Sequence, residues 1–494
     1  MKSILLSDLP GLLGGELAGA SSSTPLCTSL TASSAAVSPG AIFVAVRGTT
    51  VDGHRFIQDA FARGAVAAVV EDPSSLAGRP GIVVPNARRA LSRLAALFYG
   101  EPSTDIACIG VTGTNGKTTI NWIVYHVLNA IGGGCQRIGT LGSEVMGGNT
   151  EVGSLTSPDA ISIQRLLYEA RLSGAKNSVM ETSSHALDQA RVEDVCFDVG
   201  VFSNLTRDHL DYHQTMDRYF EAKRRLFELL AKSPKSNKGA VVNADDEYGR
   251  RIIADLPALG VRSWSFGSAA DAVLRIASIE ETAEGMHISL DDSQSGERVT
   301  IRAPFIGRHN AENVVCAYGA CRALGFDPAR IIPALAAVPQ VPGRLERVGA
   351  VGPRVFVDYA HTPDALKRAL QAVRSTTTGE LWVVFGCGGD RDRGKRPEMA
   401  AIASEYADQV VITSDNPRTE SPQAIINDIM VGAASPRIVD VDRREAIRQT
   451  ISLASRNDTV LIAGKGHEDY QIIGTEKTYF SDQAVAAEVL GGSL

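Results

Sequence analysis

Residues 109–119 have the composition of a loop that wraps around a phosphate group. An apolar run leads into Gly113-Thr114-Asn115-Gly116-Lys117-Thr118-Thr119, and apolar residues at helical spacing follow. Glycines let the backbone amides curl around a phosphate, and the N-terminus of the helix adds positive potential. Lys117 would reach the β- and γ-phosphates of a nucleotide, and the Thr118 hydroxyl would be a ligand of Mg²⁺. The loop predicts ATP or GTP binding but no particular reaction, and Val111 replaces the first glycine of the usual motif.

Three further residues have side chains that could take part in chemistry near this loop. Glu181 and His209 each lie just beyond an apolar run that predicts a strand. Ligands of open parallel sheets bind beyond the carboxyl ends of the strands, which favours a metal site there. Lys223 lies in an amphipathic segment, 219–227, with aromatic or aliphatic residues three and four positions away on both sides. The alternative for this lysine is that it extends along the helix to its solvated edge.

Together these segments resemble the Mur ligase family of ATP-dependent peptide-bond-forming enzymes, which is related to the folylpolyglutamate synthases. The resemblance extends over nearly the whole chain and rests on six motifs in order, at residues 113–119, 179–185, 204–213, 307–313, 343–346 and 358–363. In this family the γ-phosphoryl group of ATP passes to a substrate carboxylate, and the amine of an amino acid attacks the resulting acyl phosphate. The resemblance implies four catalytic residues, which are Lys117, Glu181, His209 and Lys223.

The resemblance also implies how ATP and the metal are bound. ATP would lie on Gly113, Thr114, Asn115, Gly116, Lys117, Thr118 and Thr119. Asn310 would contact the adenine, and Arg344 and Asp358 would engage the phosphate and ribose side. Lys223 would be carbamylated, and Mg²⁺ would be held by Thr118, Glu181, His209 and the modified Lys223.

The C-terminal motifs are similar to those of one member of the family. Residues 386–397, Asp415-Asn416-Pro417-Arg418 and 464–470 resemble the enzyme that adds the third residue to UDP-N-acetylmuramoyl-L-alanyl-D-glutamate. The Asp-Asn-Pro-Arg form is that of the type that adds meso-diaminopimelate, and the lysine-adding type is the alternative. The resemblance implies that diaminopimelate is bound by Arg391, Asp415, Asn416, Pro417, Arg418, Gly464 and Glu468.

The nucleotide-sugar substrate is expected to contact residues of both the N-terminal and the central part of the chain. By resemblance these are Ala32, Ser34, Thr49, Thr50, Val51, Thr156, Ser157, Ser183, Gln189, Arg191 and Lys223. The sequence departs from the family at two places. Ser33-Ser34-Ala35 replaces the usual Asp-Ser-Arg, and Leu155 stands where an asparagine is sometimes found.

The strands and helices that must position these residues follow a pattern that predicts an α/β fold of three domains. Residues 1–103 are expected to form a small α/β domain that binds the UDP-muramoyl substrate, with strands near 41–46 and 65–70. Residues 104–340 alternate apolar strands with amphipathic helices, which predicts a central P-loop domain with a mostly parallel sheet and a more irregular, antiparallel stretch at 265–303. Residues 341–494 repeat the pattern and are expected to form a Rossmann-like domain that binds the amino acid.

Composition restricts the class of protein. The chain has 494 residues, with 49 Lys and Arg against 56 Asp and Glu, and the net charge of −7 argues against a nucleic-acid partner. Its seven cysteines are scattered without a CxxC motif, as in reduced cytosolic proteins. The N-terminal apolar run is too short for a signal peptide, and no run approaches the roughly 18 residues of a membrane span. We therefore expect a cytoplasmic monomer without a membrane anchor, whose partners are its small-molecule substrates.

Two other functions stay open at this level. A folylpolyglutamate synthase would use the same chemistry, but the stretch of about 100 residues before the phosphate loop argues against it. A nucleotide-binding scaffold without activity would have no need for Lys117, Glu181, His209 and Lys223 together.

Overall fold

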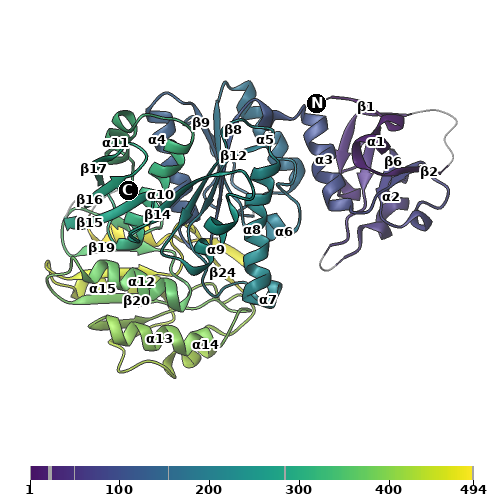
Figure 1. The fold of residues 1–494 in the computed structure, drawn as a ribbon. Helices are drawn as coiled ribbons and strands as arrows, with labels where there is room; N and C mark the ends of the chain where they lie inside the picture. Colours follow the sequence, from purple (N-terminus) through teal and green to yellow (C-terminus); the bar gives the residue numbers. More distant parts are fainter. Residues whose placement is uncertain (1, 20–24, 49–50, 154, 283–284, 492–494) are drawn as a thin grey trace. The chain divides into compact units, whose positions relative to one another are not determined.

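The computed structural model describes residues 2–19, 25–48, 51–153, 155–282 and 285–491, and Figure 1 labels its helices and strands. The chain divides into two compact units. One contains Met1–Leu274 and Cys316–Ile331, and the other contains Arg275–Val315 and Ile332–Leu494. The predicted domain limits after residues 103 and 340 stay predictions.

The N-terminal part of the first unit is built on a five-stranded sheet with the order β2-β7-β6-β5-β4. Its strands are β2 (Glu16–Ala18), β4 (Ser29–Thr31), β5 (Ala41–Val44), β6 (Ala65–Val70) and β7 (Gly81–Val83). Strands β4 to β7 run parallel, and β2 is antiparallel to β7. A short pair, β1 (Ile4–Leu5) and β3 (Leu26–Cys27), precedes them, with helices α1 (Leu9–Leu13), α2 (Ile57–Ala62) and α3 (Ala87–Tyr99).

Helix α3 illustrates why the sequence folds this way locally. The Asn86 side chain accepts a hydrogen bond from the backbone N–H of Arg89 at 3.0 Å, and so caps the helix N-terminus. Gly100 ends the helix at a φ of 71°, in the left-handed conformation that glycine adopts without a steric penalty. Leu94 and Phe98 lie four residues apart on its buried face and pack into the core of the sheet.

The rest of the first unit contains a sheet in which β10-β9-β11-β8-β12-β13-β14 are neighbours in that order. The strands are β8 (Ala107–Thr112), β9 (Cys135–Gly139), β10 (Gly142–Val145), β11 (Asn177–Glu181), β12 (Phe197–Phe202), β13 (Gly239–Asn243) and β14 (Arg262–Gly267). All run parallel except β10. The helices are α4 (Lys117–Ala130), α5 (Ala160–Leu172), α6 (Ser184–Asp188), α7 (Leu210–His213), α8 (Met216–Lys232) and α9 (Glu247–Asp255). The expected parallel sheet is confirmed.

The expectation of an antiparallel stretch from residue 265 is wrong at its start. Strand β14 continues to Gly267 in parallel with β13, with Trp264 opposite Val241. The antiparallel pairing is confirmed farther on, after β15 (Leu274–Thr282). There β16 (Gly285–Asp292) and β17 (Glu297–Ala303) pair from Met286 opposite Ala303 to Asp292 opposite Glu297. Apolar residues on both faces mark a parallel strand, and the serines of β14 concealed that pattern.

The second unit contains a six-stranded sheet with the order β18-β19-β23-β20-β21-β22. Its strands are β18 (Glu346–Val348), β19 (Arg354–Asp358), β20 (Leu381–Phe385), β21 (Gln409–Ile412), β22 (Ile438–Val439) and β23 (Thr459–Ala463). All are parallel except β18. The helices are α12 (Pro363–Arg374), α13 (Lys395–Tyr406), α14 (Pro422–Met430), α15 (Arg443–Leu453) and α16 (Asp482–Val489), and β24 (Tyr470–Ile473) and β25 (Glu476–Tyr479) form a hairpin.

Both faces of this second sheet are covered. One core cluster contains Leu366 and Met399 of helices α12 and α13, and another contains Ile447 and Val485 of α15 and α16. Two more helices, α10 (Arg308–Ala323) and α11 (Pro328–Ala336), precede the sheet in the chain. Parallel strands with helices on both faces confirm the predicted α/β class and the Rossmann-like architecture of this part. No helix in the described ranges is both long and apolar enough to cross a membrane.

Candidate functional site

The predicted phosphate loop joins β8 to α4 in the first unit. Gly113 and Gly116 have φ angles of 147° and 88°, which residues with a Cβ rarely adopt. A Cβ on Gly113 would lie 2.0 Å from the Ser203 Oγ, so the close approach of the two segments also requires glycine. Lys117 Nζ donates to the carbonyl oxygens of Gly113 at 2.9 Å and Thr114 at 2.7 Å. The Lys117 side chain therefore folds back over the loop in which the phosphates are expected to bind.

A second loop, after β12, fixes the shape of the phosphate loop. Ser203 Oγ donates to the Asn115 carbonyl oxygen at 2.5 Å, and the Asn204 side chain accepts from the Asn115 N–H at 3.0 Å. The backbone N–H of Thr206 donates to Thr114 Oγ1 at 3.0 Å. These bonds hold the loop in a curled shape, as a phosphate site requires.

Glu181 ends β11 and is 2% exposed. Its carboxylate accepts hydrogen bonds from the backbone N–H of Thr140 at 2.8 Å and from the hydroxyls of Thr118 at 3.1 Å and Thr140 at 3.2 Å. The structure thus places together two of the predicted metal ligands, Glu181 and Thr118. Both offer hard oxygen donors of the kind that Mg²⁺ prefers, so these residues fit the metal that the fold implies.

Lys223 lies on α8 with its side chain fully enclosed, so the alternative of an extended, solvated lysine is wrong. Its Nζ donates to the Gly113 carbonyl oxygen at 2.8 Å and lies 4.5 Å from the centre of the Tyr219 ring. Burial holds the pKa of this amine well below its usual range, and the charge of Lys117 lowers it further. A larger fraction of this amine is therefore neutral than for an exposed lysine.

His209 lies among aromatic rings beside this lysine. Its ring is 5.0 Å from that of His185 and 6.1 Å from that of Tyr219, and desolvation lowers its pKa. Its Nε2 is 3.4 Å from the Asp208 carboxylate. Within the described residues, no three His, Cys, Asp or Glu side chains form a group that could hold a metal ion, so His209 does not join Glu181 in such a group.

Five of the residues expected to contact the nucleotide-sugar substrate form one network around Glu181. Ser157 Oγ donates to the Glu181 carbonyl oxygen at 2.7 Å and accepts from the backbone N–H of Ser183 at 3.0 Å. Arg191 Nη1 donates to the Ser157 carbonyl oxygen at 2.8 Å, and its Nη2 donates to Gln189 Oε1 at 2.7 Å. Thr156 accepts from the Thr140 hydroxyl at 3.1 Å, so it belongs to the same network.

The N-terminal residues of the predicted substrate site are more dispersed. Ala32 and Val51 are exposed, and Ser34 is half-buried at the start of a short 3₁₀ turn. Thr49 and Thr50 lie outside the described residues. None of these three described side chains forms a hydrogen bond or ion pair with the network around Glu181 in the structure.

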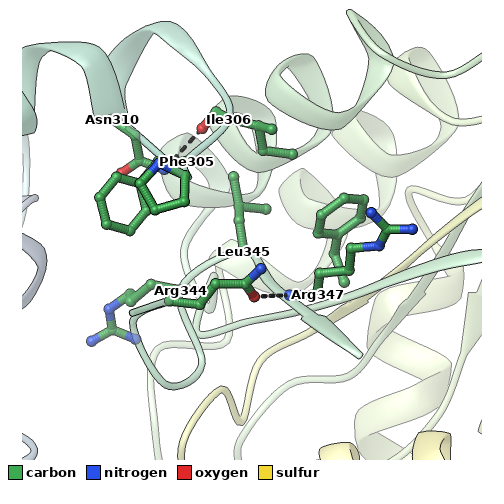
Figure 2. A pocket seen from close by; sticks show the side chains of 9 residues that line it. Phe305, Ile306, Asn310, Arg344, Leu345 and Arg347 are labelled. Atoms are coloured by element: carbon green, nitrogen blue, oxygen red, sulfur yellow. Dashed lines mark hydrogen bonds between the residues drawn. The ribbon is translucent and has the colours of Figure 1, made fainter. Parts of the chain in front are cut away.

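Residues expected to contact the adenine and ribose belong to the second unit, where a pocket lies between the segments 304–310 and 340–347. Figure 2 shows Asn310 and Arg344 in this pocket, with Leu345 between them in the view. The Asn310 Nδ2 donates to the Ile306 carbonyl oxygen at 2.9 Å. Asp358 accepts from the N–H groups of Leu345 at 2.7 Å and Ala360 at 2.8 Å, and burial raises its pKa.

The amino-acid motifs also converge within the second unit, at the carboxyl ends of β21 and β23. The Asn416 Nδ2 donates to Glu468 Oε2 at 3.0 Å, and Gly464 turns at a φ of 119° next to Asp415. Lys465, which the sequence analysis did not single out, lies in the middle of this group and is completely buried. Its position between two glycines at the end of a strand was the only signal that could have found it.

Arg418 and Arg391 lie at the same end of the sheet. Arg418 has a φ of 50° and donates from Nη1 to the Gly389 carbonyl oxygen at 2.8 Å. Its backbone pairs with β24, since its N–H donates to the Ile472 carbonyl oxygen at 3.1 Å. Pro417 immediately before it is buried, while Arg391 is exposed and donates to the neighbouring Asp390 carbonyl oxygen at 3.1 Å.

Three family models match separate parts of the chain. They are described as "Mur ligase family, catalytic domain" at residues 27–99, "Mur ligase middle domain" at 111–321 and "Mur ligase, glutamate ligase domain" at 343–466. A protein of Geobacter metallireducens named UDP-N-acetylmuramoyl-L-alanyl-D-glutamate--2,6-diaminopimelate ligase is 43% identical over 98% of this chain and 97% of its own length. The chain belongs to the Mur ligase family.

Two further Mur ligase relatives extend this comparison. A protein of the same name from Thermosynechococcus vestitus is 45% identical over 92% of this chain and 90% of its own length. A solved structure, also titled as a UDP-N-acetylmuramoyl-L-alanyl-D-glutamate--2,6-diaminopimelate ligase, is 31% identical, covers 99% of both chains and has a TM-score of 0.73. The Mur ligase resemblance seen in the six motifs is thereby confirmed along the whole chain.

Proposed function

We propose that this chain is an ATP-dependent ligase that adds meso-diaminopimelate to UDP-N-acetylmuramoyl-L-alanyl-D-glutamate, a step in the synthesis of peptidoglycan precursors. The observation that carries the proposal is the 45% identity over nearly the full length to a ligase of that name. The geometry supports it, because the phosphate loop, the network around Glu181 and the group around Lys465 provide sites for a nucleotide, a peptide and a charged amino acid.

The reaction follows from the weak reactivity of a carboxylate. An oxygen of a D-glutamyl carboxylate attacks the γ-phosphorus of ATP, ADP leaves, and an acyl phosphate forms. The neutral amine of diaminopimelate then attacks the acyl carbon, the C–N bond forms, and phosphate leaves. Lys117 would exchange its bonds to the loop carbonyl groups for bonds to the phosphate oxygens, whose negative charge it neutralises.

We assign the metal and the carbamate to the residues beside the phosphate loop. Thr118 and Glu181 would hold Mg²⁺, which supplies charge neutralisation at the phosphates. His209 would be a further ligand of the metal. Lys223 would carry a carbamate. The support for this is its burial, its low pKa and its lack of a carboxylate partner at ion-pair distance within the described residues, since a neutral amine is the form that takes up CO₂.

The remaining assignments follow the same reasoning. Residues 1–103 would bind the UDP-muramoyl substrate, residues 104–340 ATP, and residues 341–494 the amino acid. Arg391 and Arg418 would bind carboxylates of diaminopimelate, while Asp415 and Glu468 would face an ammonium group. We further propose that the protein acts in the cytoplasm as a monomer with small molecules as its partners.

A phosphate-release assay with separate substrates tests the function. We expect phosphate release only when ATP, Mg²⁺, the nucleotide dipeptide and diaminopimelate are all present, and a product mass equal to dipeptide plus diaminopimelate minus water. Equal or better use of lysine would assign the lysine-adding type instead. Release with folate and glutamate would assign a folylpolyglutamate synthase, and release in no mixture would indicate a scaffold.

A further inference from the structure

We propose that Lys465 sets the net charge of the amino-acid pocket and thereby favours the zwitterionic diaminopimelate over the more positive lysine. The inference rests on the proposed function, because it concerns the same pocket. It assigns Lys465 as a positioning and specificity-determining residue that acts through its carboxylate neighbours.

The contacts of Lys465 place its charge between the two acidic groups of the pocket. Its Nζ lies 3.7 Å from Asp415 Oδ1 and 3.6 Å from Glu468 Oε2, and it donates to Asn416 Oδ1 at 3.1 Å. The ring of Tyr470 covers it, with the Nζ 5.5 Å from the ring centre. A side chain with no exposed surface cannot itself bind a substrate in this form, so its effect must pass through Asp415, Asn416 and Glu468.

The backbone around Lys465 directs the side chain inward. Gly464 and Gly466 have φ angles of 119° and 53°, and a Cβ on Gly466 would come within 2.6 Å of the Tyr359 Cβ. A Cβ on Gly464 would lie 2.8 Å from Asp415 Oδ2. The turn can therefore fit between Tyr359 and Asp415 only with glycines on both sides of the lysine.

The acidic groups within ion-pair distance of Lys465 keep a small negative excess, and the charges of Arg391 and Arg418 come in addition, because these two are assigned to the carboxylates of diaminopimelate. Asp415 and Glu468 supply two carboxylates, and Lys465 compensates one of them. The neighbouring Arg443 adds no net charge, because it is paired with Asp482 at 2.7 Å. One uncompensated carboxylate suits one ammonium group, while two would attract a ligand of higher positive charge.

This charge balance distinguishes the two amino acids. At neutral pH diaminopimelate has two carboxylates and two ammonium groups, whereas lysine has one carboxylate and two ammonium groups and so a net charge of +1. Removal of the Lys465 charge makes the pocket more negative and favours lysine. Removal of the Glu468 charge makes the pocket more positive and disfavours lysine.

A charge cycle tests the inference through the ratio of kcat/KM for diaminopimelate to that for lysine. We expect Lys465→Gln to lower this ratio roughly ten-fold or more, Glu468→Gln to raise it, and the double variant Lys465→Gln/Glu468→Gln to return it close to that of the unmodified protein. Lys465→Arg keeps the charge and should keep the ratio. Lys367→Gln, which removes the charge of a lysine on α12 that lies over the Tyr406 ring, is the matched control and should leave it unchanged.

Each result decides a separate question. The KM for ATP reports on the integrity of the fold and should stay constant in all variants. An unchanged ratio in Lys465→Gln would overturn the role of Lys465. So would two single changes that shift the ratio in the same direction, with a larger shift in the double variant. If Lys465→Gln does not fold, Glu468→Gln and the charge-balanced double variant still decide it. Absence of diaminopimelate-dependent phosphate release from the unmodified protein would overturn the proposed function instead.

Discussion

Two buried lysines of this protein have opposite surroundings, and their chemistry differs for that reason. Lys465 lies between two carboxylates, which compensate its charge within the pocket. Lys223 contacts the Gly113 carbonyl oxygen and the Tyr219 ring, and neither carries a negative charge that would offset the lost hydration of its ammonium form. The charge of the first lysine is balanced by neighbouring carboxylates, whereas burial lowers the pKa of the second.

This difference predicts that Lys223→Ala abolishes turnover. Burial lowers the pKa of Lys223, so a larger fraction of the amine is neutral near pH 7 than for an exposed lysine, and CO₂ can add to it. Short carboxylates in the buffer should partly restore activity, and ¹³C-labelled bicarbonate should give a carbamate NMR signal that the variant lacks. Lys232→Ala, at the exposed end of the same helix, should retain both activity and signal. Full activity of Lys223→Ala would contradict the prediction.

A second prediction at the residue scale concerns Arg418. A guanidinium can bind the second carboxylate of diaminopimelate through two parallel hydrogen bonds, which lysine cannot offer. We expect Arg418→Ala to lose about 2–5 kcal/mol of transition-state stabilisation with diaminopimelate, and much less with lysine. Steady-state kinetics with both amino acids measure this. Arg393→Ala, which removes a more exposed arginine near Glu420, is the control, and equal losses with both substrates would reject the assignment.

The sequence predicted candidate site residues where the residue types and their spacing indicate a chemical role. Lys117 and Glu181 follow strands, and the structure places them beside the phosphate loop and the Thr118 hydroxyl. Lys465 could not be predicted in this way, because a lysine between two glycines is also typical of a solvated turn. Its burial depends on the contacts of the turn with Asp415 and Tyr359, which are distant in sequence.

At the scale of elements, helices α15 and α16 are joined by a fully buried ion pair. Arg443 donates to both carboxylate oxygens of Asp482, at 2.8 and 2.7 Å, and neither side chain is exposed. Arg443 also donates to the carbonyl oxygens of Ser414 at 3.3 Å and Ala463 at 3.0 Å, at the ends of β21 and β23. The pair therefore connects two helices with the strand ends that carry the group around Lys465.

We expect Arg443→Met to lower the free energy of unfolding by about 3–5 kcal/mol, because it leaves the Asp482 carboxylate buried without a partner. Arg444→Met is the matched control: Arg444 is on the same helix and pairs with Glu488 of α16 at 2.9 Å, but both side chains are exposed. Its loss should cost at most about 1 kcal/mol. Urea unfolding of the two variants measures the difference, and equal costs would contradict the role assigned to the buried pair.

The sequence predicted parallel strands well where they are continuously apolar, and poorly where they contain polar residues. Strands such as Leu381–Phe385 have continuous apolar runs because helices cover both faces of the sheet. Strand β14 contains Ser263 and Ser265, so the same rule failed there although the strand is parallel. The left-handed conformation of Arg418 could not be predicted either, because its pairing with β24 joins segments more than 50 residues apart.

At the scale of the whole molecule, the seven cysteines report on the integrity of both units. All are free thiols, six of them are buried and Cys196 is half-buried. Burial raises the pKa of every one of these thiols, to about 11 for Cys27 and about 12 for Cys321 and Cys387. The thiolate is the form that reacts. Poor access and a small thiolate fraction therefore both protect the cysteines of the folded chain.

We therefore expect iodoacetamide at pH 8 to label at most Cys196 in the folded protein and all seven cysteines in urea. Intact-mass spectrometry with time counts the labels, and Cys196→Ser should remove the early one. Cys27 and Cys387 lie in different units, so their labelling rates measure how often each unit opens. If several cysteines react as fast as Cys196 without denaturant, the packing that encloses them is not the one described. If Cys27 and Cys387 become reactive at different urea concentrations, the two units unfold separately, and a single free energy of unfolding does not describe the chain.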